Sequence, residues 1–228
     1  MPDVVNFALN WDAEGERMFE TGVDHGVLYV WDSTQNKYGD GVVWNGLTGV
    51  TNSPEGAEPT DLWADNIKYA TLRSAETFGA TIEAYMFPPE FAECDGSSKY
   101  ANGVYIGQQS RKPFGFCYRT KVGTDTDTDA SKYKIHVIYN ATASPSERSY
   151  ETINDSPDAI TMSWEIKATP VNVSGHKPTS EIVFNSWEMD SGKLAILEST
   201  LYGTAASQGG SGTAASLPAP DALLALLA

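Results

Sequence analysis

The sequence has few cysteines and no long apolar run. Its two cysteines, Cys94 and Cys117, have neither a C-x-x-C spacing nor a histidine at ligand spacing, so a disulfide framework and a zinc site are not expected. We expect two buried free thiols. No stretch approaches the roughly 20 apolar residues of a membrane span, and residues 1–17 lack the basic start and apolar run of a signal peptide. These absences predict a soluble protein, made in the cytosol, with no membrane partner.

Basic residues are also scarce. The chain has 15 lysines and arginines against 30 aspartates and glutamates, which gives a formal net charge of −15. The acidic excess is concentrated in residues 1–60 and 124–190. A chain of this charge repels a phosphate backbone, so an ordinary nucleic-acid-binding protein is not expected.

Alternation of apolar and polar residues is the dominant pattern in the chain. In residues 160–168 the apolar row is Ile160, Met162, Trp164 and Ile166. Further strands are predicted at 26–31, 67–73, 81–86, 114–121, 133–139 and 180–187. Alternation of this kind is typical of antiparallel sheets with one packed and one solvated face. The pattern predicts a mainly β protein.

One amphipathic helix is expected near the C-terminal end of this region. Residues 189–202 place Leu194, Leu197 and Leu201 at helical spacing and end before Gly203. A single helix of this kind usually covers an apolar sheet face or edge. A shorter helical turn is predicted at 89–94.

Segments rich in turn formers separate the predicted strands. Long loops are expected at 45–66, 123–131 and 142–159. Loops of this length in a compact β domain are often functional, and in an assembling subunit they would serve as contact arms.

The composition changes after Gly203. Residues 204–216 have the composition of a flexible linker, and residues 217–228 form an apolar tail that could be a docking peptide or a frayed end. We expect this part to be an appendage outside the folded core. The predicted organisation is an N-terminal arm at 1–20, one domain at 21–203, and a linker with an apolar tail at 204–228.

Candidate catalytic residues are weakly supported. Glu83, Glu90 and Glu93 could form the carboxylate pair of a glycosidase, but a solvated acidic turn explains them better.

Other site patterns are incomplete. Asp125, Asp127 and Asp129 have the spacing of a calcium loop, yet the glycine and the closing glutamate are missing. The histidines are far apart, and no nucleophile elbow or phosphate loop occurs. We expect no catalytic residue, no metal and no cofactor, and therefore no enzyme.

Long runs of the chain resemble one protein family. They lie at 42–85, 91–96 (FAECDG), 103–123 (GVYIGQQSRKPFGFCYRTKVG), 133–165 and 168–184, with the helix near 190–203. The sequence resembles the major tail proteins, or tail tube proteins, of long-tailed bacteriophages that infect Gram-positive bacteria. The resemblance implies an antiparallel β-sandwich or half-barrel with one flanking α-helix, which contributes strands to a ring-shaped β-barrel.

The resemblance also implies a function. Six copies would form a ring, and stacked rings would form the tube through which DNA is ejected. The implied partners are the chain itself, the tape measure protein, and the tail terminator and tail tip proteins, with DNA only as passing cargo. The implied location is the virion tail, after synthesis in the bacterial host cytoplasm.

Charge and resemblance together indicate where assembly contacts would lie. Because acidic subunits repel each other, buried contacts between loops must dominate, and we expect Trp44, Trp63, Pro54 and Pro59 to contribute to them. The bore should be acidic or neutral, because a basic one would bind the passing duplex. One row that we expect to face the bore is Thr161, Ser163 and Glu165.

Two other functions stay open at this point. One is a binding module for a host receptor or a carbohydrate. The other is a β-sandwich hydrolase that uses Glu83, Glu90 and Glu93.

Overall fold

The computed structural model describes residues 9, 11–150, 152–153, 158–206 and 211–227. Within these residues the strands are β1 (Met18–Asp32), β2 (Lys37–Tyr38), β3 (Val42–Trp44), β4 (Leu47–Asn52), β5 (Glu55–Gly56), β6 (Pro59–Ala64), β7 (Ile67–Arg73), β8 (Glu76–Ala84), β9 (Ser98–Ala101), β10 (Val104–Ile106), β11 (Phe114–Thr124), β12 (Lys132–Ala143), β13 (Met162–Ala168) and β14 (Glu181–Asn185). The helices are η1 (Pro89–Glu93), α1 (Ser191–Tyr202) and α2 (Pro220–Ala225).

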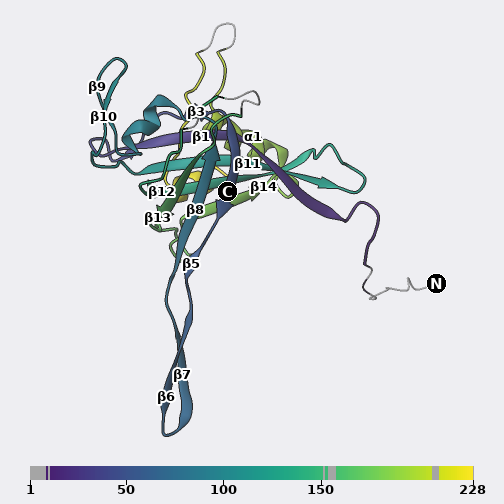
Figure 1. The fold of residues 1–228 in the computed structure, drawn as a ribbon. Helices are drawn as coiled ribbons and strands as arrows, with labels where there is room; N and C mark the ends of the chain where they lie inside the picture. The colour runs from purple at the N-terminus through teal and green to yellow at the C-terminus, as the bar shows by residue number, and fades with distance from the viewer. Residues whose placement is uncertain (1–8, 10, 151, 154–157, 207–210, 228) are drawn as a thin grey trace, which may run out of the picture.

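A large antiparallel sheet forms the body of the molecule (Figure 1). Its strand order is β2–β1–β11–β12–β13–β8–β4, with β3 paired to β1, β14 to β12 and β5 to β8. Every strand predicted from alternation overlaps a strand of the structure. The prediction of a mainly β, antiparallel protein with one main helix is confirmed.

The central strands are buried on both faces, whereas alternation predicted one wet face. On β11, Phe116 and Tyr118 pack into one core cluster, and Cys117 between them packs into the other. The first cluster fills the concave side of the curved sheet, where Trp164 meets Phe91 of η1. The second lies under α1. This double burial explains why residues 114–118 of β11 include no charged side chain.

Helix α1 covers the outer face of the sheet, as predicted. The Asp190 side chain accepts hydrogen bonds from the backbone amides of Gly192 and Lys193, which caps the helix start. Leu197 and Leu201 are completely buried against the sheet. No helix in the described part of the chain is long and apolar enough to cross a membrane.

The C-terminal tail packs against the body, so the prediction of an appendage outside the core is wrong for this segment. Leu217 and Leu223 are buried in the same cluster as α1. Leu217 lies over Gly115, where a Cβ atom would come within 2.2 Å of its Cδ2 atom, so a larger residue at position 115 would displace the leucine. Asp221 accepts hydrogen bonds from the amide and hydroxyl of Ser174. Residues 207–210 of the predicted linker lie outside the described residues.

The predicted N-terminal arm also differs at its boundary. Strand β1 begins at Met18, and Met18 to Glu20 pair with residues 122–124 of β11. The body therefore begins before residue 21. Residues 1–8 and 10 of the predicted arm lie outside the described residues.

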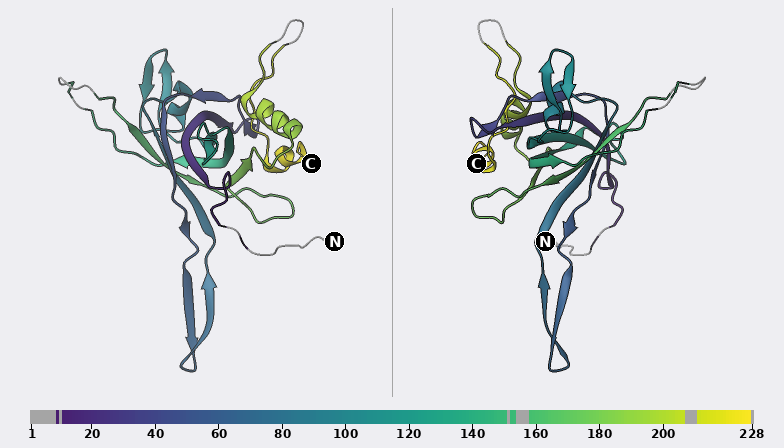
Figure 2. Two further views of the ribbon diagram at one scale, coloured as in Figure 1. Left: turned by 90° about the vertical axis from the view of Figure 1, so that its right-hand side faces the viewer. Right: turned by 60° about the vertical axis from the view of Figure 1, so that its left-hand side comes forward.

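The predicted loop at 45–66 is instead made of strands. Strands β6 and β7 pair over residues 59–73 and form a hairpin, called the long hairpin below, that projects away from the sheet (Figures 1 and 2). Asp65 and Asn66 form its two-residue turn with φ of 51° and 61°, values that match the twist of a tight hairpin. The turn formers in this segment had indicated a loop, and the structure places Pro54 between β4 and β5 and Pro59 at the first position of β6.

Candidate assembly surfaces

The long hairpin exposes an unusual number of large apolar side chains. They are Leu62, Trp63, Ile67, Tyr69 and Leu72. Lys68 and Thr71 on β7 each bond the Asp61 carboxylate of β6, at 2.7 and 2.8 Å, and so tie the two strands together. Beyond the sheet, a hairpin of two strands has no core of its own and is only marginally stable in water. Its apolar surface is therefore available for a partner.

Three of the four predicted assembly residues lie on or beside this hairpin. Trp63 is 68% exposed on β6, and Pro54 and Pro59 are exposed where the hairpin leaves the sheet. Their contacts with other subunits stay a prediction.

The fourth predicted assembly residue, Trp44, is a core residue. It is only 2% exposed, because β3 pairs with β1 and directs the indole into the concave side of the sheet. There its ring contacts Phe91, Phe116 and Trp164. A side chain buried in this way has no surface to offer to a neighbour, so its assignment as an assembly contact is wrong.

A polar face runs across β8 and β13, opposite the core. Ser163 and Glu165 lie on this face of β13, beside Glu83 and Thr81 of β8 in register. Thr161 is exposed and immediately precedes the strand. The strand pairing shows that Thr81 and Glu83 continue the row of Ser163 and Glu165.

Charge on this polar face is mixed but mainly acidic. The Lys167 ammonium lies 2.9 Å from a Glu55 carboxylate oxygen and 4.0 Å from one of Glu165. The hydrogen bond and negative charge of Glu55 raise the pKa of Lys167. The carboxylates of Glu55, Glu83 and Glu165 therefore outnumber the single ammonium group, that of Lys167.

A second exposed apolar surface lies on the hairpin of β9 and β10. Tyr100, Val104, Tyr105 and Ile106 are all exposed there. Between this hairpin and η1 is a pocket of about 270 Å³. Its lining residues are Val30, Pro89, Glu90, Glu93, Lys99 and Tyr105. Sequence reasoning identified Glu90 and Glu93 but missed the pocket, because strands far apart in the chain form its walls.

Ion pairs join β1 to the centre of the sheet. Arg119 donates two hydrogen bonds to the Asp24 carboxylate, at 2.7 and 3.0 Å, and Lys134 pairs with Glu20 at 2.5 Å. Burial alone would raise the pKa of Asp24, but the hydrogen bonds and charge of Arg119 outweigh it and lower the pKa. For Glu20, the contacts with Lys134 and Thr120 outweigh burial in the same way. These pairs stabilise the sheet.

His136 is part of the same network. Its ring stacks on Tyr118 with the centroids 4.6 Å apart and the planes within 4°. Its Nδ1 lies 3.0 Å from a Glu181 carboxylate oxygen, and its Nε2 lies 3.2 Å from the Thr120 hydroxyl. The histidine therefore links β11, β12 and β14, and its role is structural.

The catalytic candidates are not brought together. Glu83 points away from the core face that its neighbours Ile82 and Ala84 share with η1, whereas Glu90 and Glu93 lie on η1. The sheet therefore separates Glu83 from the other two carboxylates. Within the described ranges, no three histidine, cysteine or acidic side chains form a group that could hold a metal ion.

The two thiols are inert. Cys94 and Cys117 are both buried and free, as predicted. Burial raises the pKa of each to about 12, so the reactive thiolate is scarce at neutral pH.

Comparison with known proteins identifies the family. Residues 17–201 match the family described as "Phage tail tube protein". No curated protein matches the chain. Among solved structures, the sheath–tube complex of an extracellular contractile injection system is similar at 12% identity, with a TM-score of 0.30 over 71% of this chain and 88% of that one.

Two terminating proteins are similar to the same degree. The sheath/tube terminator of the extracellular contractile injection system has 13% identity and a TM-score of 0.32, over 78% of this chain and 99% of that one. The tube-terminating cap of an anti-feeding prophage has 10% identity and a TM-score of 0.31, over 80% of this chain and 97% of that one. The family match, which spans most of the sequence, carries the assignment. The chain belongs to the phage tail tube protein family, and it is a structural component of the virion tail and not an enzyme.

Proposed function

We propose that copies of this chain assemble into stacked hexameric rings that form the tail tube, and that this tube is the conduit for DNA ejection. The observation that carries the proposal is the long hairpin with its exposed apolar side chains, Trp63 foremost. A patch of this kind on a structural virion protein marks a protein–protein contact. Its burial against a neighbour would gain about 25 cal/mol for each Å² of apolar surface.

The sheet itself supports ring closure. Strand β4 lies at one end of the main strand order, and β2 and β3 flank β1 at the other. Exposed strand edges favour pairing with other chains, and closing a ring of subunits into a common barrel removes such edges. Ring formation would therefore satisfy backbone groups that a single copy leaves to water.

We assign the polar face of β8 and β13 to the bore. Thr161, Ser163 and Glu165 would face the lumen, with Glu83 beside them in register. Duplex DNA carries one negative charge per roughly 1.7 Å of axis, so a mainly acidic wall repels it and does not hold it.

The partners follow from the geometry of an open stack. Contacts between unlike surfaces leave one unoccupied surface at each end of the tube. We assign one end to a tail terminator protein and the other to the tail tip proteins, with the tape measure protein in the bore before DNA enters. Synthesis would take place in the host cytoplasm.

Negative-stain microscopy and sedimentation of purified protein test this proposal. The wild-type chain should form tubes with six-fold end views at high concentration. Trp63→Ser should require about 30-fold more protein to assemble, the equivalent of about 2 kcal/mol for a central contact residue.

Ile196→Ser is the matched control, because Ile196 is 44% exposed but lies on α1. This variant should assemble like the wild type. Wild-type protein that stays dispersed at all concentrations would contradict self-assembly. Normal tubes of Trp63→Ser would contradict the role of the long hairpin.

A further inference from the structure

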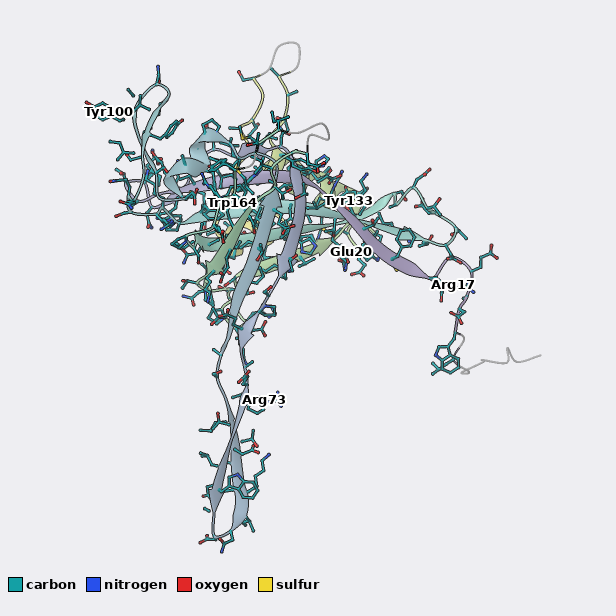
Figure 3. The ribbon with its side chains drawn as sticks, in the orientation of Figure 1. Arg17, Glu20, Arg73, Tyr100, Tyr133 and Trp164 are labelled. Atoms are coloured by element: carbon teal, nitrogen blue, oxygen red, sulfur yellow. The ribbon has the colours of Figure 1, made fainter. Side chains whose placement is uncertain are left out.

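The two exposed apolar hairpins lie at opposite ends of the molecule. The long hairpin points to one end, and the β9–β10 hairpin points to the other in all three views (Figures 1 and 2). In Figure 3, Tyr100 on β9 marks one end, and Arg73 on β7 marks the base from which the long hairpin extends toward the other end. The long hairpin therefore cannot reach the β9–β10 hairpin of its own chain. A second copy, placed end to end, brings the two surfaces together.

The pocket beside β9 and β10 has the lining that an aromatic side chain requires. Val30, Pro89 and Tyr105 provide apolar walls, and the exposed Glu90 adds a carboxylate to the lining. Glu93 is already paired with Lys112 at 2.6 Å. Glu90 forms no salt bridge with any residue that the structure describes, so its oxygens can accept a new hydrogen bond.

The tip of the long hairpin has the complementary groups. The Trp63 indole combines a large apolar surface with a ring N–H that can only donate a hydrogen bond. When a tryptophan is buried at an interface, this N–H needs a hydrogen-bond acceptor on the partner. Two residues further along, Asp65 is exposed at the turn. Lys99 is exposed at the pocket and pairs with no described residue. An indole opposite Glu90 and a carboxylate opposite Lys99 match in polarity and charge.

We propose that the long hairpin of one copy docks on the β9–β10 end of a second copy, with Trp63 in the pocket and Asp65 near Lys99. The inference rests on the proposed self-assembly and names the surface that receives the hairpin. The contact joins two different surfaces, so each docked copy presents a free hairpin to the next copy. Head-to-tail repetition of this contact produces a stack of unlimited length.

Site-directed cross-linking of assembled tubes tests the contact. The double variant Ala64→Cys with Lys99→Cys places one thiol beside Trp63 and one at the pocket. A short bifunctional maleimide should then link copies into a ladder of covalent multimers on a denaturing gel. Cys94 and Cys117 do not compete, because both are buried.

Each single cysteine variant should give no ladder. The matched control pairs Ala64→Cys with Lys193→Cys, which is exposed on α1 away from the pocket, and should also give none. A ladder from the control pair, with none from the Lys99→Cys pair, would overturn the proposed docking site.

A second measurement covers the case in which the double variant fails to assemble. Protein with benzoylphenylalanine at position 63 keeps an aromatic side chain there. Ultraviolet light should attach it to a peptide within residues 87–106 of another copy, identified by mass spectrometry. Attachment elsewhere, with tubes intact, would refute the docking and leave the tube standing, whereas wild-type protein without tubes would refute the proposed function itself.

Discussion

The indole Nε1 of Trp44 donates a hydrogen bond of 2.9 Å to the backbone oxygen of Met86. This bond satisfies the single polar group of a side chain that is otherwise surrounded by Phe91, Phe116 and Trp164. Trp63, in contrast, has its ring in solvent. Both tryptophans were predicted from the sequence to be assembly contacts, but their roles differ. Trp44 stabilises the subunit, whereas Trp63 is available for assembly.

Trp44→Ala should destabilise the isolated subunit strongly. It removes a large buried side chain and leaves a cavity between η1 and the sheet, for which the cost in unfolding free energy is about 3–5 kcal/mol. Urea unfolding followed by circular dichroism measures it. Trp63→Ala is the control and should change the unfolding free energy by no more than about 0.5 kcal/mol. Equal effects of the two substitutions would contradict the assignment.

Leu223→Ala should destabilise the subunit by about 2–5 kcal/mol, because Leu223 is completely buried under α1. Truncation after Gly203 should cost more, since it also removes Leu217 from its place over Gly115. Leu226→Ala, at a 46% exposed position of the same segment, is the matched control and should be nearly neutral. Thermal melting resolves these differences. A truncated chain that melts with the full chain would show that the segment does not contribute to the core.

Asp24→Asn should weaken the subunit at neutral pH and flatten its response to acid. Because Arg119 lowers the pKa of Asp24, the stabilisation is complete above the unfolded value of about 3.9 and is lost as pH falls through the lower folded value. At pH 7 the loss of this charged hydrogen-bonded pair should cost about 1–3 kcal/mol.

Urea midpoints at neutral pH and below the folded pKa of Asp24 test this prediction. The difference between wild type and Asp24→Asn should shrink in acid. Glu58→Gln, at an exposed position without a salt bridge to any described residue, should show no such convergence. A difference that stays constant with pH would exclude the Arg119 pair as its source.

Salt should promote tube formation. Each copy adds a formal charge of −15, and raising the ionic strength from about 0.05 to about 0.5 M shortens the distance over which these charges repel. The apolar side chains of the long hairpin are not weakened by this screening. The sedimented fraction should therefore rise with sodium chloride. Tubes that dissolve as salt rises would indicate that ion pairs hold the subunits together.

Alternation and helix capping were sufficient to predict much of the body. The alternating rows predicted at 114–121, 133–139 and 160–168 all overlap strands. Helix α1 spans Ser191–Tyr202, within two residues of the predicted 189–202 at either end. These signals are local, because a strand or helix with one buried face repeats its apolar residues at a fixed spacing. The same rule failed for 45–66. Strand β6 of the long hairpin has no covered face within its own chain, and its residues 59–64 show no apolar alternation.

Local pattern and charge thus established an acidic, mainly β chain with one covering helix. Long-range packing decided the rest. It buries Trp44 against η1 and places Leu217 over Gly115. It also brings Val30 of β1 into the pocket beside β9. It also placed Glu83 of β8 beside Ser163 of β13. Each of these depends on residues that are distant along the chain and become neighbours only when the sheet forms, so no spacing within a short segment records them.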